Sequence, residues 1–283
     1  MQASRPVNEA RQKANKAKNE TKPWIRRFGR FGYMAQGVVY GLIGVLALMA
    51  AFGSGGQTTG QSGALQSVAN MPFGSVLLWV IGIGLIGYVV WEIVKCFKDP
   101  ENRGSDAKGI IIRIGYFISG IIYGAIAFNA IKLAIGSGGS DGGGQQTLSA
   151  KLLSQPFGQW IIGIVGVVII GYGLYEFISG YKKTFMSKFK TSEMNQQETK
   201  IARKAGKMGL MARGTVLAMV GYFFIQTAIT ANPDETKGLG GALSELAQQP
   251  YGTWLLALVA LGLVLYGIYS IIRGRYEHMA LGR

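Results

Sequence analysis

Two ionisable residues lie within or beside apolar stretches of this 283-residue chain, where a charge is costly unless it is paired. Glu176 lies six residues before Lys182, and Arg213 lies six residues after Lys207. At 1.5 Å per residue, each would lie about 9 Å deeper in a membrane than its basic neighbour. Opposite charges at similar depth in a low-dielectric layer usually pair. We therefore hypothesise a Glu176–Arg213 ion pair; the alternative is two separate interfacial residues.

Two further charged candidates lie nearer the ends of apolar stretches. Glu92 is three residues before Lys95, so its side chain could extend into the lipid headgroups. Lys132 occupies the same repeat position as Gln226. These two residues would line an outer vestibule, or Lys132 would extend along the helix to water, and we favour the second interpretation.

The composition excludes several kinds of catalytic site. Cys96 is the only cysteine and His278 the only histidine, so an internal disulfide, a multi-cysteine zinc site and a two-histidine haem are all excluded. Gly82–Gly87 matches G-x-G-x-x-G, but it lies inside an apolar span instead of between a strand and a helix. No nucleophile has an adjacent base, so we expect no catalytic, cofactor or metal site and no enzyme.

The elements that must position these residues are six apolar runs, each long enough to cross a bilayer core of about 30 Å. They cover approximately Phe31–Phe52, Phe73–Trp91, Ile114–Ile131, Phe157–Tyr175, Gly214–Ala231 and Tyr251–Ile272, and none contains Asp, Glu, Lys or Arg. The sequence therefore predicts an all-α integral membrane protein with six transmembrane helices.

The basic residues indicate the orientation of these spans. Of the 29 Lys and Arg residues, nine lie in residues 1–30, five between Lys95 and Arg113, and eight between Lys182 and Lys207. This excess predicts that both termini are cytoplasmic. The basic arm lacks a base-stacking platform, so we expect it to meet anionic lipid headgroups and no nucleic acid. A protein partner or a homo-oligomer is a further candidate.

The six spans form three copies of one pattern. The copies open at Arg30, Arg113 and Lys207, and each shows Pro-aromatic-Gly about forty residues later. Two spans per copy give all copies one orientation, which predicts a pseudo-threefold axis along the membrane normal. The expected segments are a basic arm (1–27), three repeats (28–98, 110–182 and 204–275) and a cytoplasmic tail (276–283).

Each outer loop has a glycine-rich stretch followed by a short segment with helical apolar spacing, such as Leu65 and Val68 or Leu148 and Leu152. Proline then ends this segment and starts the next span. We expect three short helices that cap the bundle against water, in preference to mobile lids over a pathway.

Small residues four apart recur at matching places in the odd-numbered spans, where they would let helix backbones approach closely. The pairs are Gly37 and Gly41, Gly120 and Gly124, and Gly214 and Ala218. They predict odd helices packed near the axis, or packed against the even helix of their own copy. The even spans end in aromatic residues typical of an interfacial belt: Tyr88, Trp91, Tyr172, Tyr175, Tyr266 and Tyr269.

The pattern R-x-G-Y-x-x-x-G-x-x-Y-G, followed by a glycine-rich loop, an apolar turn and Q-P-F-G, resembles a bacterial membrane family known as domain of unknown function 1206. The resemblance covers residues 27–275, and Met208–Gly214 is close to the family's usual opening. Gln36 and Ser119 depart from its arginine, which stands here only at Arg213. The resemblance implies three two-span copies and a bacterial inner membrane, with no established activity.

Two functional classes remain open on this sequence. Transporters usually keep several polar groups at mid-depth and interrupt helices there, whereas these spans are mostly Gly, Ile, Leu, Val and Ala and contain no proline. We therefore favour a structural, regulatory or lipid-binding component of the membrane or of a membrane complex. The alternative is a passive pore or carrier for a small solute along the pseudo-threefold axis.

Overall fold

A computed structural model describes residues 5–100, 104, 106–137 and 144–279. The side chains of the basic arm before residue 23, the glycine run 138–143 and the last residues of the tail lie outside the described part. Over the described residues the chain is helical, and an isolated bridge between Phe189 and Glu277 is its only strand-like pairing.

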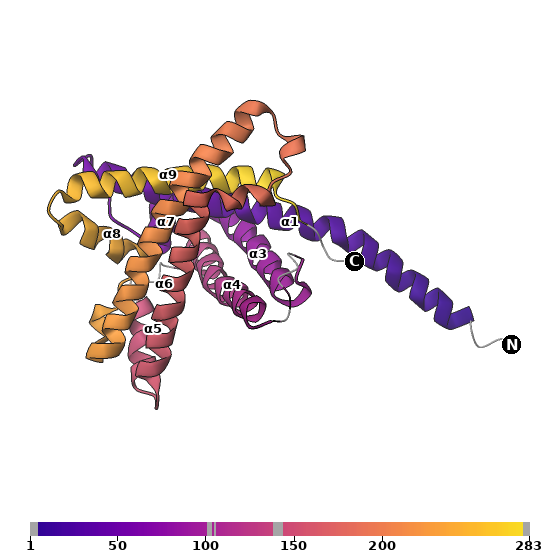
Figure 1. The fold of residues 1–283 in the computed structure, drawn as a ribbon, viewed down its shortest axis with the longest axis horizontal. Coiled ribbons are helices and arrows are strands. Elements are labelled where there is room, and N and C mark those ends of the chain that lie inside the picture. Colours follow the sequence, from indigo (N-terminus) through magenta and orange to yellow (C-terminus); the bar gives the residue numbers. More distant parts are fainter. Residues whose placement is uncertain (1–4, 101–103, 105, 138–143, 280–283) are drawn as a thin grey trace.

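Six long helices carry the apolar runs, which confirms the predicted fold class for the described residues. They are α1 (Arg5–Ala51), α3 (Gly74–Lys98), α4 (Ala107–Ala134), α6 (Gly158–Lys182), α7 (Gln196–Thr230) and α9 (Gly252–Tyr276). Helix α1 begins many residues before its apolar part. This N-terminal part of α1 extends away from the other helices (Figure 1). The pseudo-threefold axis stays a prediction.

The long helices pack in an open series. The strongest pairings join α6 with α7, α1 with α9, and α3 with α4, and α1 with α3 and α7 with α9 connect these pairs. Figure 1 shows α1 and α9 side by side, and α6 and α7 side by side at a steep angle to them. Over the described residues α4 does not pack along α6, although both belong to copy 2. The series therefore ends at α4 and at α6, and a closed ring of six helices would need a further interface between these two.

Glycines set the closest of these pairings. A Cβ added at Gly37 on α1 would lie 2.6 Å from the carbonyl oxygen of Gly267 on α9, and one at Gly214 on α7 would lie 2.5 Å from that of Gly173 on α6. Gly37 and Gly214 therefore face the even span of the preceding copy. The sequence had predicted that they pack the odd helices near the axis or against the even helix of their own copy, and the structure shows neither arrangement. The reason is that these crossings let backbone approach backbone, where dispersion and weak Cα–H···O contacts hold helices together.

The remaining small positions of the motif are less crowded. An added Cβ would meet nothing within 4 Å at Gly41 or Gly124, and only the Cβ of Glu92, at 3.7 Å, at Gly120. Gly41 and Ala218 still border the close crossings. A Cβ added at Gly267 would lie 2.9 Å from the backbone nitrogen of Gly41, and one added at Gly173 would lie 2.9 Å from that of Ala218. Gly120 and Gly124 belong to α4, so the looser packing is in copy 2.

Side-chain bulk accounts for the missing interface in copy 2. In copy 1 a Cβ added at Gly84 on α3 would lie 2.5 Å from the Cβ of Ala35 on α1. The same alanine–glycine contact recurs in copy 3, between Ala212 and Gly262. Copy 2 has Ile118 and Val168 at these positions, and both are exposed. Two β-branched side chains cannot fit where an alanine and a glycine touch, so α4 and α6 stand apart.

Three short helices join the long ones at one end of the bundle: α2 (Gln61–Ala69), α5 (Gly144–Leu153) and α8 (Leu239–Gln248). This end is called the short-helix end below, and the opposite end the terminal end. Leu65 and Val68 of α2 are buried, as a cap requires. Leu148 of α5 is 59% exposed, so its predicted apolar face is wrong: α5 packs on α6 and the 3₁₀ turn η3 (Pro233–Glu235), because α4 and α6 leave it no closed bundle to cover.

The Pro-aromatic-Gly motif forms a tight corner between each short helix and the next span. Its aromatic residue has a positive φ of 61° to 64° at Phe73, Phe157 and Tyr251 and is the residue that caps the span. The span begins at the following glycine, so the proline lies in the turn and not in the first helical turn as predicted. A Cβ added at Gly252 would lie 2.0 Å from the carbonyl oxygen of Ala247. The motif thus needs glycine for close approach.

The hydrophobic core continues into the terminal end. The connection between α6 and α7 contains two 3₁₀ turns, η1 (Thr184–Lys188) and η2 (Thr191–Glu193). Phe185 and Phe189 pack against Tyr269 of α9, with ring centroids 5.3 and 5.8 Å away. The amide of Lys190 donates to the carbonyl of Tyr276 at 3.0 Å.

We expect cysteines at Ala35 and Gly84 to cross-link and cysteines at Ile118 and Val168 not to, in a Cys96→Ser background. The first pair joins packed helices and the second spans the gap between α4 and α6. Oxidation of protein in native membranes, followed by a gel-mobility assay, measures both. Equal cross-linking of the two pairs would show that copy 2 closes like copy 1.

We expect Gly252→Ala to lower the stability of the protein by about 1–3 kcal/mol, because the added methyl overlaps the backbone of the preceding helix. Gly41→Ala is the control, since its methyl meets nothing within 4 Å and alanine favours a helix. Thermal unfolding in detergent measures both changes. A Gly252→Ala protein as stable as the control would contradict the close-approach argument.

Candidate functional site

A buried polar cluster brings all six long helices together. We call it the tyrosine–arginine cluster. It consists of Gln36 and Tyr40 from α1, Tyr88 from α3, Tyr123 from α4, Tyr172 and Glu176 from α6, Arg213 from α7, and Tyr266 from α9. Most of these side chains are buried, and Tyr172, beside the gap between α4 and α6, is 46% exposed. The cluster is therefore the place where the three copies meet.

An ion pair holds the cluster together. The guanidinium of Arg213 donates to a carboxylate oxygen of Glu176, and both side chains are 7% exposed. The hypothesised pair across α6 and α7 is thus present in the structure. The position of the pair follows from the glycines of these helices. Gly214, next to Arg213, and Gly173, three residues before Glu176, let the two backbones touch beside the charges.

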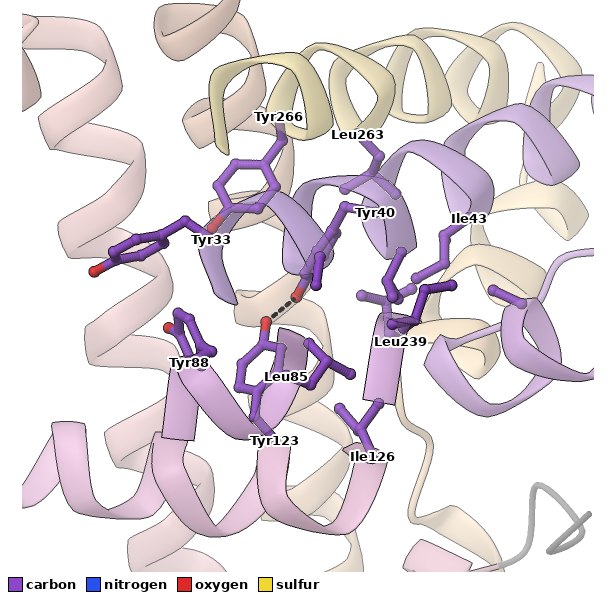
Figure 2. Close-up of a cluster of buried hydrophobic side chains, with 14 of the residues drawn as sticks. Tyr33, Tyr40, Ile43, Leu85, Tyr88, Tyr123, Ile126, Leu239, Leu263 and Tyr266 are labelled. Atoms are coloured by element: carbon purple, nitrogen blue, oxygen red, sulfur yellow. Dashed lines mark hydrogen bonds between the residues drawn. The ribbon is translucent and has the colours of Figure 1, made fainter. Parts of the chain in front are cut away.

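Hydrogen bonds extend the ion pair across to α1 and α4. The Nε of Arg213 donates to the hydroxyl of Tyr40 at 3.0 Å, and the hydroxyl of Tyr123 donates to the same oxygen at 3.4 Å. Gln36 donates in turn to Tyr123 at 2.7 Å. Figure 2 shows the hydroxyls of Tyr40 and Tyr123 facing each other, with Tyr88 and Tyr266 beside them. One continuous chain of polar contacts therefore crosses four helices.

Aromatic faces surround the arginine. The guanidinium carbon lies 4.8 Å from the ring centroid of Tyr266, 5.1 Å from that of Tyr40 and 5.9 Å from that of Tyr172. The negative face of an aromatic ring attracts a cation, by an amount that grows when water is excluded. The rings thus supply part of the stabilisation that water gives an exposed arginine.

A second buried pair lies on α3. Glu92 accepts from Lys95 of the same helix, and the two side chains are 1% and 4% exposed. The hydroxyl of Tyr33 accepts from Lys95 at 3.4 Å, and the Lys95 ammonium lies 4.2 Å from the ring centroid of Tyr116. The expectation that Glu92 extends into the headgroups is therefore wrong, because Lys95 neutralises it inside the protein.

A third pair lies near the end of α9. Arg273 donates to Glu277 at 2.6 and 2.9 Å, and the guanidinium carbon is 4.2 Å from the ring centroid of Tyr33. Tyr33 therefore contacts the cations of the second and third pairs, one from α3 and the other from α9.

The three pairs compensate one another's departures from the repeat. Glu92, Glu176 and Ser270 are equivalent positions, as are Lys95, Ser179 and Arg273, and as are Gln36, Ser119 and Arg213. Copy 2 has Ser179 where the other copies have a cation, and Arg213 from copy 3 takes the place of that cation. Copy 3 has Ser270 where the other copies have a carboxylate, and Glu277, seven residues later, takes its place. Each of the three cations thus has a carboxylate, and the six charges sum to zero.

Two oxygens of the tyrosine–arginine cluster have no partner among the described residues: the second carboxylate oxygen of Glu176 and the side-chain oxygen of Gln36. A buried acceptor without a donor costs free energy, and ordered water commonly satisfies such groups. The arrangement holds one buried charge pair, whose carboxylate is engaged by the arginine.

The other predicted residues lie outside this cluster. Lys132 is half-buried near the short-helix end of α4, with its ammonium 5.8 Å from the ring centroid of Phe128, one turn nearer the middle of the helix, and both interpretations of Lys132 stay predictions. Among the described residues no group of three or more His, Cys, Asp or Glu side chains is arranged to hold a metal ion.

The predicted interfacial belt is wrong for copies 1 and 3, where Tyr88, Trp91, Tyr266 and Tyr269 are buried. Tyr266 lies over the guanidinium of Arg213, and Tyr88 and Tyr269 pack on other aromatic rings inside the bundle. In copy 2 the equivalent rings of Tyr172 and Tyr175 are about half exposed. Sequence reasoning also missed Lys95 and Arg273 as buried cations. Their shared repeat position was the available signal, although boundary cations give the same pattern.

Comparison with known proteins agrees with this repeat organisation. The model of a family described as Domain of Unknown Function (DUF1206) matches the chain three times, over residues 31–99, 114–183 and 208–277. The chain belongs to this family. Each match contains one odd and one even span, as the predicted copies do.

A bacterial relative extends the likeness to almost the whole chain. The protein called "Uncharacterized protein YxxB" of Bacillus subtilis (strain 168) is 50% identical over 266 residues, which are 94% of this chain and 96% of the relative. No solved structure matches the chain significantly. The comparisons support a membrane protein of this DUF1206 family, with six apolar helices among the described residues.

We expect Glu176→Ala or Arg213→Ala alone to destabilise the protein by about 3–5 kcal/mol, because each leaves the other charge buried and unpaired. The double variant should lose less than the sum of the two single losses. The charge swap, Glu176→Arg with Arg213→Glu, should be better folded than either of its single changes. Thermal unfolding and the yield of folded protein measure these effects.

The exposed Lys190–Glu193 pair provides the control, since its removal should change stability little. Losses that simply add, or a swap no better than its single changes, would show that the two buried charges do not interact.

Proposed function

We propose that this DUF1206 protein is a non-enzymatic, non-conducting structural component of the membrane that holds lipid or neighbouring membrane proteins. The observation that carries the proposal is the tyrosine–arginine cluster. It fills the meeting point of the six helices with side chains that bond to each other across four of them.

The chemistry of the cluster supports a structural role over solute transport. Carriers expose ionisable groups to a solute pathway and change their partners during transport. Here the carboxylate of Glu176 is engaged by Arg213, and three aromatic rings cover the arginine. Breaking this arrangement to pass a solute would leave charges unpaired in an apolar layer.

The distribution of charge supports a place in the bacterial inner membrane with both termini in the cytoplasm. The terminal end carries the basic residues of the arm and of the connections, and the bacterial relative covers nearly the same length. Anionic headgroups would meet this end, since juxtamembrane basic segments attract them. A protein partner or a second copy would then dock through the exposed apolar surface of the spans, in the manner of transmembrane helices.

Solute flux across proteoliposomes tests the proposal. Vesicles that contain the full-length protein should pass potassium, protons and glycerol at the rate of empty vesicles, at every protein density. A channel-forming peptide in parallel vesicles shows that the assay detects a pore. Flux that rises with protein density and changes in a Tyr40→Phe variant would establish the passive pore instead.

A further inference from the structure

A groove on the outside of copy 3 combines a polar end with an apolar floor. It has a volume of about 590 Å³ and lies between α7, α8 and the η3 turn. Its floor runs along α7 through Thr215, Met219 and Tyr222. Thr215 and Tyr222 are exposed, whereas Arg213 on the opposite face of the helix is buried. The groove therefore opens away from the tyrosine–arginine cluster, toward the surrounding lipid.

The dimensions of the groove match one leaflet of a bilayer. From Thr215 to Gln226 the helix rises over eleven residues, which is about 16 Å at 1.5 Å per residue. Half of a hydrocarbon core of about 30 Å is close to this length. An acyl chain along α7 would thus reach from the polar end of the groove to the middle of the membrane.

The polar end carries an excess of negative charge. Lys237 pairs with Glu245 of α8 at 2.7 Å, and both side chains are about one third exposed. Glu235 lines the same end, and among the described residues no ion pair is found for it. Two carboxylates and one ammonium leave a net charge of −1. A cationic group is therefore attracted here, and an anionic headgroup without an ammonium is disfavoured.

This charge pattern is particular to copy 3. The positions equivalent to Glu235, Lys237 and Glu245 are Gln57, Thr59 and Ser67 in copy 1. In copy 2 the position of Glu245 is occupied by Lys151. Only one of the three copies therefore presents two carboxylates around a lysine at the mouth of the groove, so the repeat scaffold alone does not require them.

We propose that the groove binds a phospholipid whose zwitterionic headgroup carries an ammonium beside its phosphate. The ammonium meets Glu235, the phosphate lies toward Lys237, and one acyl chain follows Met219 and Tyr222 to Thr215. The inference names a lipid class for the proposed structural role and rests on it. The flux assay above tests conduction separately, so the lipid site can be disproved while the structural role stands, and the reverse also holds.

Native mass spectrometry of the full-length protein in detergent tests the site. The protein is titrated with phosphatidylethanolamine and with phosphatidylglycerol that carry the same acyl chains. Wild type should bind the first about tenfold more tightly. Glu235→Gln should lower that affinity about tenfold, and Met219→Trp, which fills the floor, should weaken binding of both lipids.

Glu193→Gln, at an exposed glutamate of the terminal end, is the matched control and should bind as wild type does. Thermal unfolding of each variant shows that the fold is kept. Equal affinity of wild type for the two lipids, or no effect of Glu235→Gln, would overturn the proposal. Displacement of the lipid by an equal concentration of free phosphoethanolamine would also overturn it, because the acyl chain would then contribute nothing.

Discussion

The cost of an unpaired charge in an apolar layer is the constraint on which this fold depends. Arg213 stands in the interior of a six-helix bundle, where it is kept by Glu176 on α6, the hydroxyl of Tyr40 and three aromatic rings. Removing a buried partner typically costs several kcal/mol, which is comparable with the whole stability of many proteins. The contacts of this one arginine therefore fix the relative positions of α1, α6, α7 and α9.

Close backbone contact makes such pairing possible. In a membrane, apolar side chains gain little by leaving lipid for protein, so helices associate where small residues let them approach. Gly214 and Gly173 bring α6 and α7 together beside the ion pair, and Gly37 and Gly267 do the same for α1 and α9. Copy 2 shows the converse, because Ile118 and Val168 replace the small residues and α4 does not pack along α6. Only 22% of the most apolar stretch of α6 is buried, against 44% in α7.

Much of the fold could be predicted from the sequence because hydropathy and repetition act locally. Six apolar runs of sufficient length predicted six spans, and the helical spacing of apolar residues before each Pro-aromatic-Gly predicted three short helices. The Glu176–Arg213 pair was also accessible, since depth in a membrane can be counted from the nearest basic residue. The helix that each glycine faces could not be predicted from the sequence. A spacing of four residues shows that the small residues share one face of a helix, but it does not show which helix packs against that face.

The errors at the site have one physical origin. A tyrosine or a lysine near the end of a span fits either a membrane boundary or the bundle interior, and the residue type does not distinguish them. Tyr88 and Lys95 were assigned to the boundary by this ambiguity, and both are buried. The repeat carries a further signal, since each buried cation stands at a position where the copies differ, and Arg213 and Glu277 replace the partners that copies 2 and 3 lack.

Moving an ion pair between copies tests this compensation most directly. Gln36 and Ser270 occupy, in α1 and α9, the positions that Arg213 and Glu176 occupy in α7 and α6. Thermal unfolding of Gln36→Arg, Ser270→Glu and the double variant in one lipid composition is the decisive measurement. We predict that each single change lowers the melting temperature strongly and that the double change restores most of the loss. A double variant as unstable as the worse single variant would contradict the account.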